Sequence, residues 1–156
     1  MKVSTVSLLT FFSFFLSCNL VYAEYCPEVK KPITTENNAK KCAQARFNDA
    51  RKDNLFNFAK EHLGNITMNK QSVSCDSDLG QNSYFANKDE LFYKAVEGIT
   101  ITSCQVDNKH EGKYRCIGNT VGPACYRKGK PTKKIAAAIA ADTGEFTTFY
   151  PTEQKN

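Results

Sequence analysis

The sequence predicts an α+β protein in which an N-terminal helix packs on an antiparallel sheet and disulfides stabilise the fold. Three observations lead to this prediction. Apolar residues recur at three- and four-residue spacing over residues 35–63, as in an amphipathic helix. Residues 99–117 and 134–150 each contain two extended runs around a polar turn. Six cysteines follow residue 23, and an even number favours disulfides in a small secreted chain.

The first 23 residues have the character of a secretory signal peptide. Lys2 supplies a positive charge, residues 6–16 form a compact apolar run, and Ala23 completes a small-residue cleavage pattern. The apolar run is too short to span a bilayer, which takes about 20 residues. We therefore predict that residues 24–156 form one secreted, monomeric domain that does not bind membranes. The formal net charge of +5 favours solubility and a weak attraction to anions, but it does not establish nucleic-acid binding.

The helical segment is predicted to begin after Thr35, whose side chain can cap it, and to end at residues 64–65. Residues 53–54 could divide it into two helices. Cys42 lies on its apolar side, so a disulfide could tie the helix to the sheet. Asn65 begins an Asn-Ile-Thr sequence, which is a glycosylation motif, and we expect this residue to be exposed.

The middle of the chain leads into the first hairpin. Residues 68–87 are polar and are expected to be irregular, whereas residues 89–96 form a short apolar element, either strand or helix. A hairpin centred on His110 places Cys104 opposite Cys116, where two cysteines can lie within bonding distance. This pair is the best-supported disulfide. The cysteines expected to form disulfides are Cys26, Cys42, Cys75, Cys104, Cys116 and Cys125.

The second hairpin, residues 134–150, is the most apolar part of the chain after the signal segment. Its first run is rich in alanine, which favours helix, but seven residues before a turn are short for a helix. We predict two strands around a turn at residues 142–144, with this hairpin at the centre of the sheet. Residues 151–156 are expected to form a polar tail.

Few residues are candidates for chemistry. His62 falls in the last turn of the predicted helix, where the helix dipole favours a cation. His110, Glu111 and Arg115 could supply an acid, a base and a phosphate clamp, although a solvated hairpin tip is the simpler interpretation. The sequence lacks the motifs of serine hydrolases, nucleotide-binding loops and zinc sites. No catalytic residue, metal site or cofactor is therefore assigned.

A run of cations precedes the second hairpin. It lies beside an aromatic residue and could bind phosphate, an anionic surface or an acidic protein. Charge runs of this kind more often face solvent without a partner. The candidate binding residues are Tyr126, Arg127, Lys128, Lys130, Lys133 and Lys134.

The order of these parts resembles that of the small secreted fungal guanyl-specific ribonucleases. It is more similar to the RNase-like secreted effectors of powdery mildews and related plant pathogens. The matching parts are Tyr25-Cys26 after the signal segment, a cysteine-containing helix at residues 39–43, and the closing strand, turn and strand at residues 139–146. The resemblance implies a ribonuclease-like fold and an effector that binds a host plant protein or RNA to promote infection.

The chain departs from the ribonuclease pattern at its chemical positions. The ribonucleases have a catalytic histidine directly before the Thr-Gly turn, where this chain has Asp142. An ordinary aspartate is ionised at neutral pH and is a poor general acid. The effectors commonly join their first cysteine to one near the end of the chain, so the partner of Cys26 stays open. We expect a catalytically inactive protein, with an active secreted ribonuclease or an unrelated small cysteine-rich inhibitor or toxin as the alternatives.

Overall fold

The computed structural model describes residues 26, 29–48, 53–69, 72–76, 82–127 and 129–153. The predicted signal segment, residues 1–23, and Lys128 lie outside the described residues. The described part combines three α-helices with antiparallel sheets and three disulfides, which confirms the α+β class. In this part of the chain, no helix is both long enough and apolar enough to span a membrane.

The helical segment consists of separate pieces. Helix α1 (Glu36–Asn48) begins where the hydroxyl of Thr35 accepts a hydrogen bond from the N–H of Asn38 at 3.2 Å. Helix α2 (Asp53–Ala59) and the 3-10 helix η1 (Lys60–His62) follow, so the segment contains two α-helices as predicted. The predicted break at residues 53–54 is wrong, because both residues belong to α2. The helical geometry ends at His62, close to the predicted extent. The predicted cap at residues 64–65 is wrong, because Leu63 follows the last turn and Gly64 belongs to β1 (Leu63–Gly64), which pairs in parallel with a distant strand.

The main sheet is antiparallel and has the order β10-β9-β6-β5. Its strands are β5 (Thr100–Val106), β6 (Lys113–Asn119), β9 (Lys134–Ala140) and β10 (Phe146–Thr152), so both predicted hairpins are confirmed. The alanine-rich run is a strand because it is hydrogen-bonded on both sides, to β6 and to β10.

The position predicted for the second hairpin is wrong in part. Strand β9 is central, but β10 is an edge strand. Residues 151 and 152, expected in a polar tail, belong to β10, and Pro151 pairs with Ile135. An edge strand tolerates proline, which has no N–H to donate to a further neighbour.

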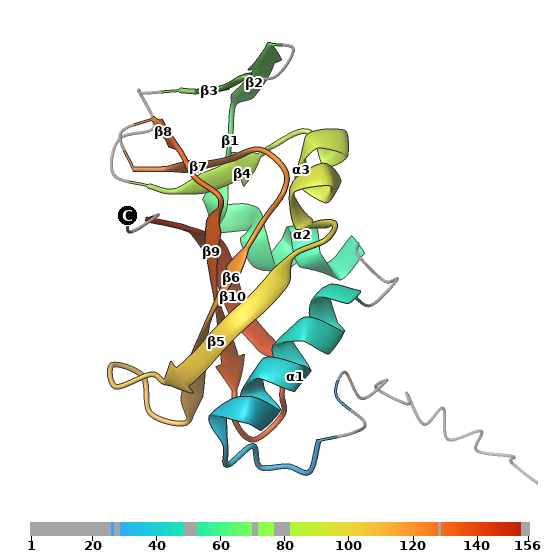
Figure 1. Ribbon diagram of the computed structural model, residues 1–156, viewed down its shortest axis with the longest axis vertical. Helices are drawn as coiled ribbons and strands as arrows, with labels where there is room; N and C mark the ends of the chain where they lie inside the picture. The colour runs from blue at the N-terminus through green and yellow to red at the C-terminus, as the bar shows by residue number, and fades with distance from the viewer. Residues whose placement is uncertain are drawn as a thin grey trace, which may run out of the picture.

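One face of the main sheet forms the core with α1 and α2 (Figure 1). Ile135, Ala137 and Ile139 alternate along β9 toward this face and are almost fully buried. From α1, the ring of Phe47 lies 4.8 Å from that of Phe146 on β10, measured between centroids. The opposite face of the sheet is left for polar side chains.

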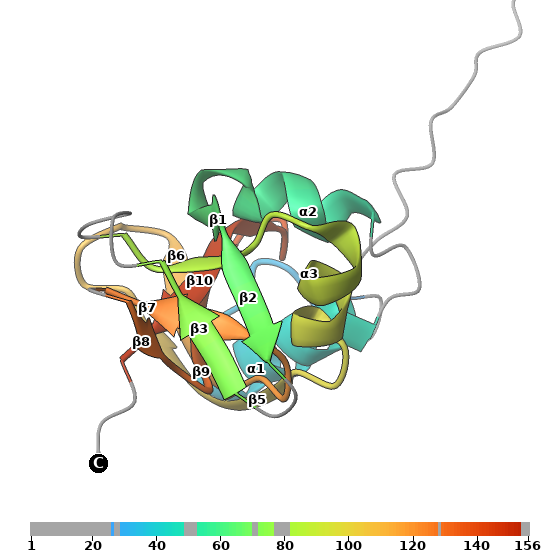
Figure 2. The ribbon, with the colours of Figure 1, turned by 90° about the horizontal axis from the view of Figure 1, so that it is seen from above.

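A second sheet of the order β1-β4-β7-β8 lies at one end of the main sheet (Figures 1 and 2). It contains β4 (Tyr84–Ala86), β7 (Ala124–Tyr126) and β8 (Lys130–Pro131), and β2 (Ile66–Asn69) and β3 (Ser72–Cys75) form a separate hairpin. The expectation that residues 68–87 are irregular is therefore wrong where the structure describes them, since β3, β4 and the end of β2 lie there and each has a pairing partner. The undecided element at residues 89–96 is helix α3 (Asp89–Val96).

Three disulfides connect the cysteines as Cys26–Cys42, Cys75–Cys125 and Cys104–Cys116. The third confirms the predicted hairpin register, in which Cys104 is opposite Cys116. The expectation that Cys42 ties the helix to the sheet is wrong, because it bonds to Cys26 in the segment before α1. That bridge still packs on the second hairpin, since the Cys42 sulfur lies 3.2 Å from the carbonyl oxygen of Gly144. Three disulfides fit a protein of an oxidising compartment.

Candidate functional site

The candidate site lies on the face of the main sheet that is turned away from α1. On β6, Lys113 and Arg115 alternate with buried residues, so their side chains belong to this outer face. The strand register places Arg115 beside Ala138 of β9, and Ala138 beside Thr148 of β10. Because the alanine side chain is small, it leaves a hollow between the arginine and the threonine.

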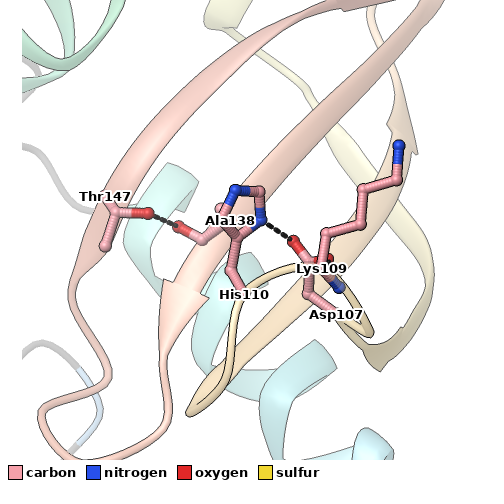
Figure 3. Close-up of polar contacts among 5 residues, drawn as sticks. All are labelled: Asp107, Lys109, His110, Ala138 and Thr147. Carbon is pink, nitrogen blue, oxygen red and sulfur yellow. Dashed lines mark hydrogen bonds and ion pairs between the residues drawn. The ribbon is translucent and has the colours of Figure 1, made fainter.

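An irregularity in β10 adds a second hydroxyl to this hollow. Phe146 pairs with Ile139 and Thr148 pairs with Ala138, so Thr147 is an extra residue in the strand. The hydroxyl of Thr147 lies 3.5 Å from the carbonyl oxygen of Ala138 (Figure 3). Bulges of this kind redirect side chains and are common beside functional sites.

The loop between β5 and β6 forms a wall of the site. Within this loop, Nδ1 of His110 lies 2.9 Å from Oδ2 of Asp107, and the backbone N–H of Lys109 donates to Oδ1 at 3.0 Å (Figure 3). The hydrogen bond from His110 and that from the Lys109 backbone hold the pKa of Asp107 below its ordinary value, with a further contribution from the charge of Arg115. His110 is the exposed member of the pair, with 62% of its side chain accessible against 13% for Asp107.

The sheet around Ala138 forms the floor of the site, and the loop between β5 and β6 forms its wall. Together they line a pocket of about 170 Å³. Its polar lining consists of Asp107, His110, Lys113, Arg115, Thr147, Thr148 and Tyr150. The pocket is smaller than the roughly 300–1,000 Å³ of typical small-molecule sites, so it suits one small group such as a phosphate. Two permanent cations, one histidine and three hydroxyls make this lining rich in donors for an anion.

Arg115 is the most informative residue of the pocket. Among the described residues, its Nε–H group is buried and has no hydrogen-bond partner. Leaving such a donor unpaired costs about 1–3 kcal/mol, and more for a charged group, so a buried donor without a partner calls for an explanation such as a functional role or a bound water or ion. Arg115 also lines a second hollow, of about 150 Å³, together with residues 105–109.

Tyr150 brings the second histidine to the site. The ring centroids of His62 and Tyr150 are 5.1 Å apart, and Tyr150 lines the pocket that His110 also lines. Nδ1 of His62 lies 3.1 Å from the carbonyl oxygen of Ser83. Since a carbonyl oxygen only accepts, Nδ1 carries the hydrogen in this contact, and Nε2 is the acceptor when the ring is neutral.

The structure brings together only part of the predicted acid, base and clamp. His110 and Arg115 share the pocket, whereas Glu111 is exposed and does not line it. Asp142 is exposed in the β9–β10 turn, where its Oδ1 accepts a hydrogen bond from the N–H of Thr143 at 2.9 Å. Asp107 is a site residue that was not predicted from the sequence.

Three other residues that line the pocket were also not predicted from the sequence, namely Lys113, Thr148 and Tyr150. Each occupies an outward position of a predicted strand, opposite to neighbours that are buried. The period-2 alternation of the two strands was the signal that could have found them.

The basic segment is divided among three structural positions instead of forming one loop. Tyr126 of β7 pairs with Lys130 of β8, and the guanidinium of Arg127 lies 5.9 Å from the centroid of the Tyr126 ring. The ammonium of Lys133 donates to the carbonyl oxygen of Val121 at 3.1 Å. Lys134 belongs to β9 and is half-buried.

The predicted glycosylation residue, Asn65, is exposed between β1 and β2. Its Oδ1 accepts a hydrogen bond from Nδ2 of Asn87 at 2.9 Å. Across the described ranges, no group of three or more histidine, cysteine, aspartate or glutamate side chains gathers in a way that could hold a metal ion. Comparison of the chain with protein-family models, curated proteins and solved structures finds no match.

Proposed function

We propose that this protein is a secreted effector with a ribonuclease-like architecture that binds host RNA without cleaving it. The observation that carries the proposal is Arg115, whose Nε–H is buried and unpaired and which lines a pocket together with Lys113 and two threonines. A phosphodiester group supplies the acceptor oxygens that these donors need, and arginine suits phosphate geometry because its donors form a planar fork.

The arrangement of the main sheet supports the proposed architecture. Helix α1 shares the core on one face, and the polar pocket lies on the other. The predicted host protein partner is less well supported than RNA, because the pocket is small, cationic and lined by hydroxyl groups. A helix over residues 134–141 would have favoured an unrelated inhibitor or toxin, but β9 covers residues 134–140.

The proposed lack of catalysis rests on the acid–base groups. Cleavage of RNA through its 2′-hydroxyl needs one group to take a proton and another to give one to the leaving oxygen. His110 is hydrogen-bonded to Asp107 and could serve in one of these roles. Asp142, at the position where the ribonucleases have histidine, is exposed in a turn and is not among the residues that line the pocket.

Binding of a labelled single-stranded RNA to the purified protein tests the proposal. The variant Arg115→Ala should weaken binding about tenfold or more, because a hydrogen bond to a charged group contributes about 1.5–3 kcal/mol. The matched control is Lys40→Ala, which removes one positive charge from an exposed position of α1, on the other side of the sheet. Equal affinities of these two variants would refute a phosphate site at Arg115.

An active ribonuclease is the second candidate, and one observation favours it. Both described histidines belong to the same side of the molecule, since His110 lines the pocket and His62 contacts Tyr150 in its lining. If the protein cleaves RNA, His110→Ala and His62→Ala should each abolish the activity. Our proposal predicts that the unaltered protein does not cleave RNA above the background rate, and cleavage that depends on His110 would contradict it.

A further inference from the structure

We infer that the RNA-binding surface continues from the pocket along β10 to the β7–β8 hairpin and holds a single strand of several nucleotides. This inference rests on the proposed function and extends it. The outward positions of β10 after Thr148 are Tyr150 and Thr152, and Thr152 pairs with Lys134. Lys134 precedes the buried Ile135 and therefore lies on the same outer face as Ala138. A further cation, beyond the two in the pocket, thus stands about 13 Å along β9 from Ala138, at about 3.3 Å per residue of strand.

The β7–β8 hairpin is fastened to this end of the face. The hydroxyl of Thr132 donates to the carbonyl oxygen of Thr152 at 2.7 Å, and the N–H of Lys134 donates to the same hydroxyl at 3.1 Å. Thr132 is buried, so this connection is shielded from water. The backbone that carries the hairpin cations is therefore held at this end of the outer face.

The hairpin presents cations beside an aromatic ring. Lys130 is exposed, and it pairs with Tyr126, whose ring lies near the guanidinium of Arg127. Figures 1 and 2 show this hairpin and the loop between β5 and β6 on the same side of the molecule, away from α1. The two loops stand at opposite ends of the main sheet in Figure 1, with the outer face between them.

Tyr150 occupies the middle of this surface. It is half-buried, and the contact with His62 restrains its ring. Aromatic rings between cations are typical of single-stranded nucleic-acid sites, because bases stack on the rings while the cations follow the backbone. Separated cations with a ring between them fit RNA better than an acidic peptide, which has no base to stack.

Affinity as a function of oligonucleotide length tests this inference. The probes are uridine 3′-monophosphate and labelled oligouridines of up to about eight nucleotides, a length within the range of known single-strand sites. Binding should strengthen with length until the strand reaches the hairpin, and then level off. In Lys130→Ala/Lys134→Ala, affinity for the longest probe should fall about tenfold, while affinity for the mononucleotide should not change. The slope of log affinity against log salt should decrease by about 1.4, or about 0.7 for each phosphate that the variant no longer neutralises.

The outcomes separate this inference from the proposed function. Binding that does not strengthen beyond the mononucleotide, or a double variant that weakens all probes equally, would overturn the extended surface alone. Mononucleotide binding that is unchanged in Arg115→Ala would overturn the pocket itself. Equal competition by polyglutamate of matched charge would overturn the choice of RNA. Lys130 is exposed at a hairpin end, so Lys130→Ala alone preserves the test if the half-buried Lys134 cannot be replaced.

Discussion

Gln44 of α1 closes one edge of the main sheet, and its replacement should destabilise the protein. Its Nε2 donates to the carbonyl oxygen of Ile99 at 2.9 Å, and its Oε1 accepts from the N–H of Ile101 at 2.8 Å. The side-chain amide thus occupies the place of a peptide group from a further strand beside β5. Since β5 is an edge strand, this contact also covers backbone groups that could pair with another chain.

The expected cost of Gln44→Ala follows from these two bonds. Each contributes about 1 kcal/mol net, and a buried partner left without a bond costs about 1–3 kcal/mol. Ile99 and Ile101 are each only 2% exposed, so water replaces the amide poorly. We expect the free energy of unfolding to fall by about 2–4 kcal/mol, a large share of the roughly 5–15 kcal/mol of a typical domain. Thermal and urea denaturation at neutral pH measure the change.

The variant Gln44→Glu separates the two bonds. An ionised carboxylate can accept from the N–H of Ile101 but cannot donate to the carbonyl of Ile99, whereas a protonated carboxyl group can do both. The pKa of the new glutamate should therefore be higher in the folded protein than its unfolded value of about 4.3. Its stabilising contribution is present below that value and is lost as pH rises through the folded-state pKa.

The matched control is Gln105→Ala, which removes an exposed glutamine from β5, the strand that Gln44 contacts. This variant should change the free energy of unfolding by less than about 0.5 kcal/mol. The reasoning fails if Gln44→Ala is as stable as this control. It also fails if Gln44→Glu shows the same pH dependence, relative to the unaltered protein, as Gln44→Ala.

Two further predictions concern the site loop and a crowded glycine. Replacing His110 by alanine should raise the pKa of Asp107 toward its ordinary value of 3.8, as an NMR titration would show; an unchanged pKa would mean that the pair does not form in solution. The stability that this pair adds is present above pH 3.8 and is lost as pH falls through the lowered pKa. Gly122→Ala should cost about 1–3 kcal/mol or more in denaturation experiments, because its Cβ would overlap the backbone of α3 at Ala95. Gly112→Ala, which meets no atom within 4 Å and is affected only through its φ of 71°, should cost less, about 1 kcal/mol.

The local pattern of apolar and turn residues was sufficient to predict those strands whose pairing partners are near in sequence. The turn centred on His110 set the register of β5 and β6, and with it the bond between Cys104 and Cys116. The alanine-rich run illustrates the weakness of propensity alone, because alanine favours helix and the run is a strand. Its length and the turn at residues 142–144 carried the correct prediction.

The candidate site could be predicted only in part, for a physical reason. Arg115 and His110 belong to one hairpin, so the sequence already placed them near each other. Thr148 and Tyr150 reach the same pocket only because β9 lies between β6 and β10, with an alanine between the arginine and the threonine. Strand order depends on packing between distant segments, which leaves no local signal in the chain.

The sequence by itself determined the α+β class, the two hairpins and one of the three disulfides. These features follow from side-chain periodicity and turn residues, which act over a few positions. Tertiary structure alone decided the edge position of β10, the bond between Cys26 and Cys42, the contact of His62 with Tyr150, and the Gln44 bonds to β5. The contacts of His62 with Tyr150 and of Gln44 with β5 join groups far apart in sequence. The bond between Cys26 and Cys42 spans only 16 residues, but the choice of this partner, like the strand order, depends on how the helices and the sheet pack.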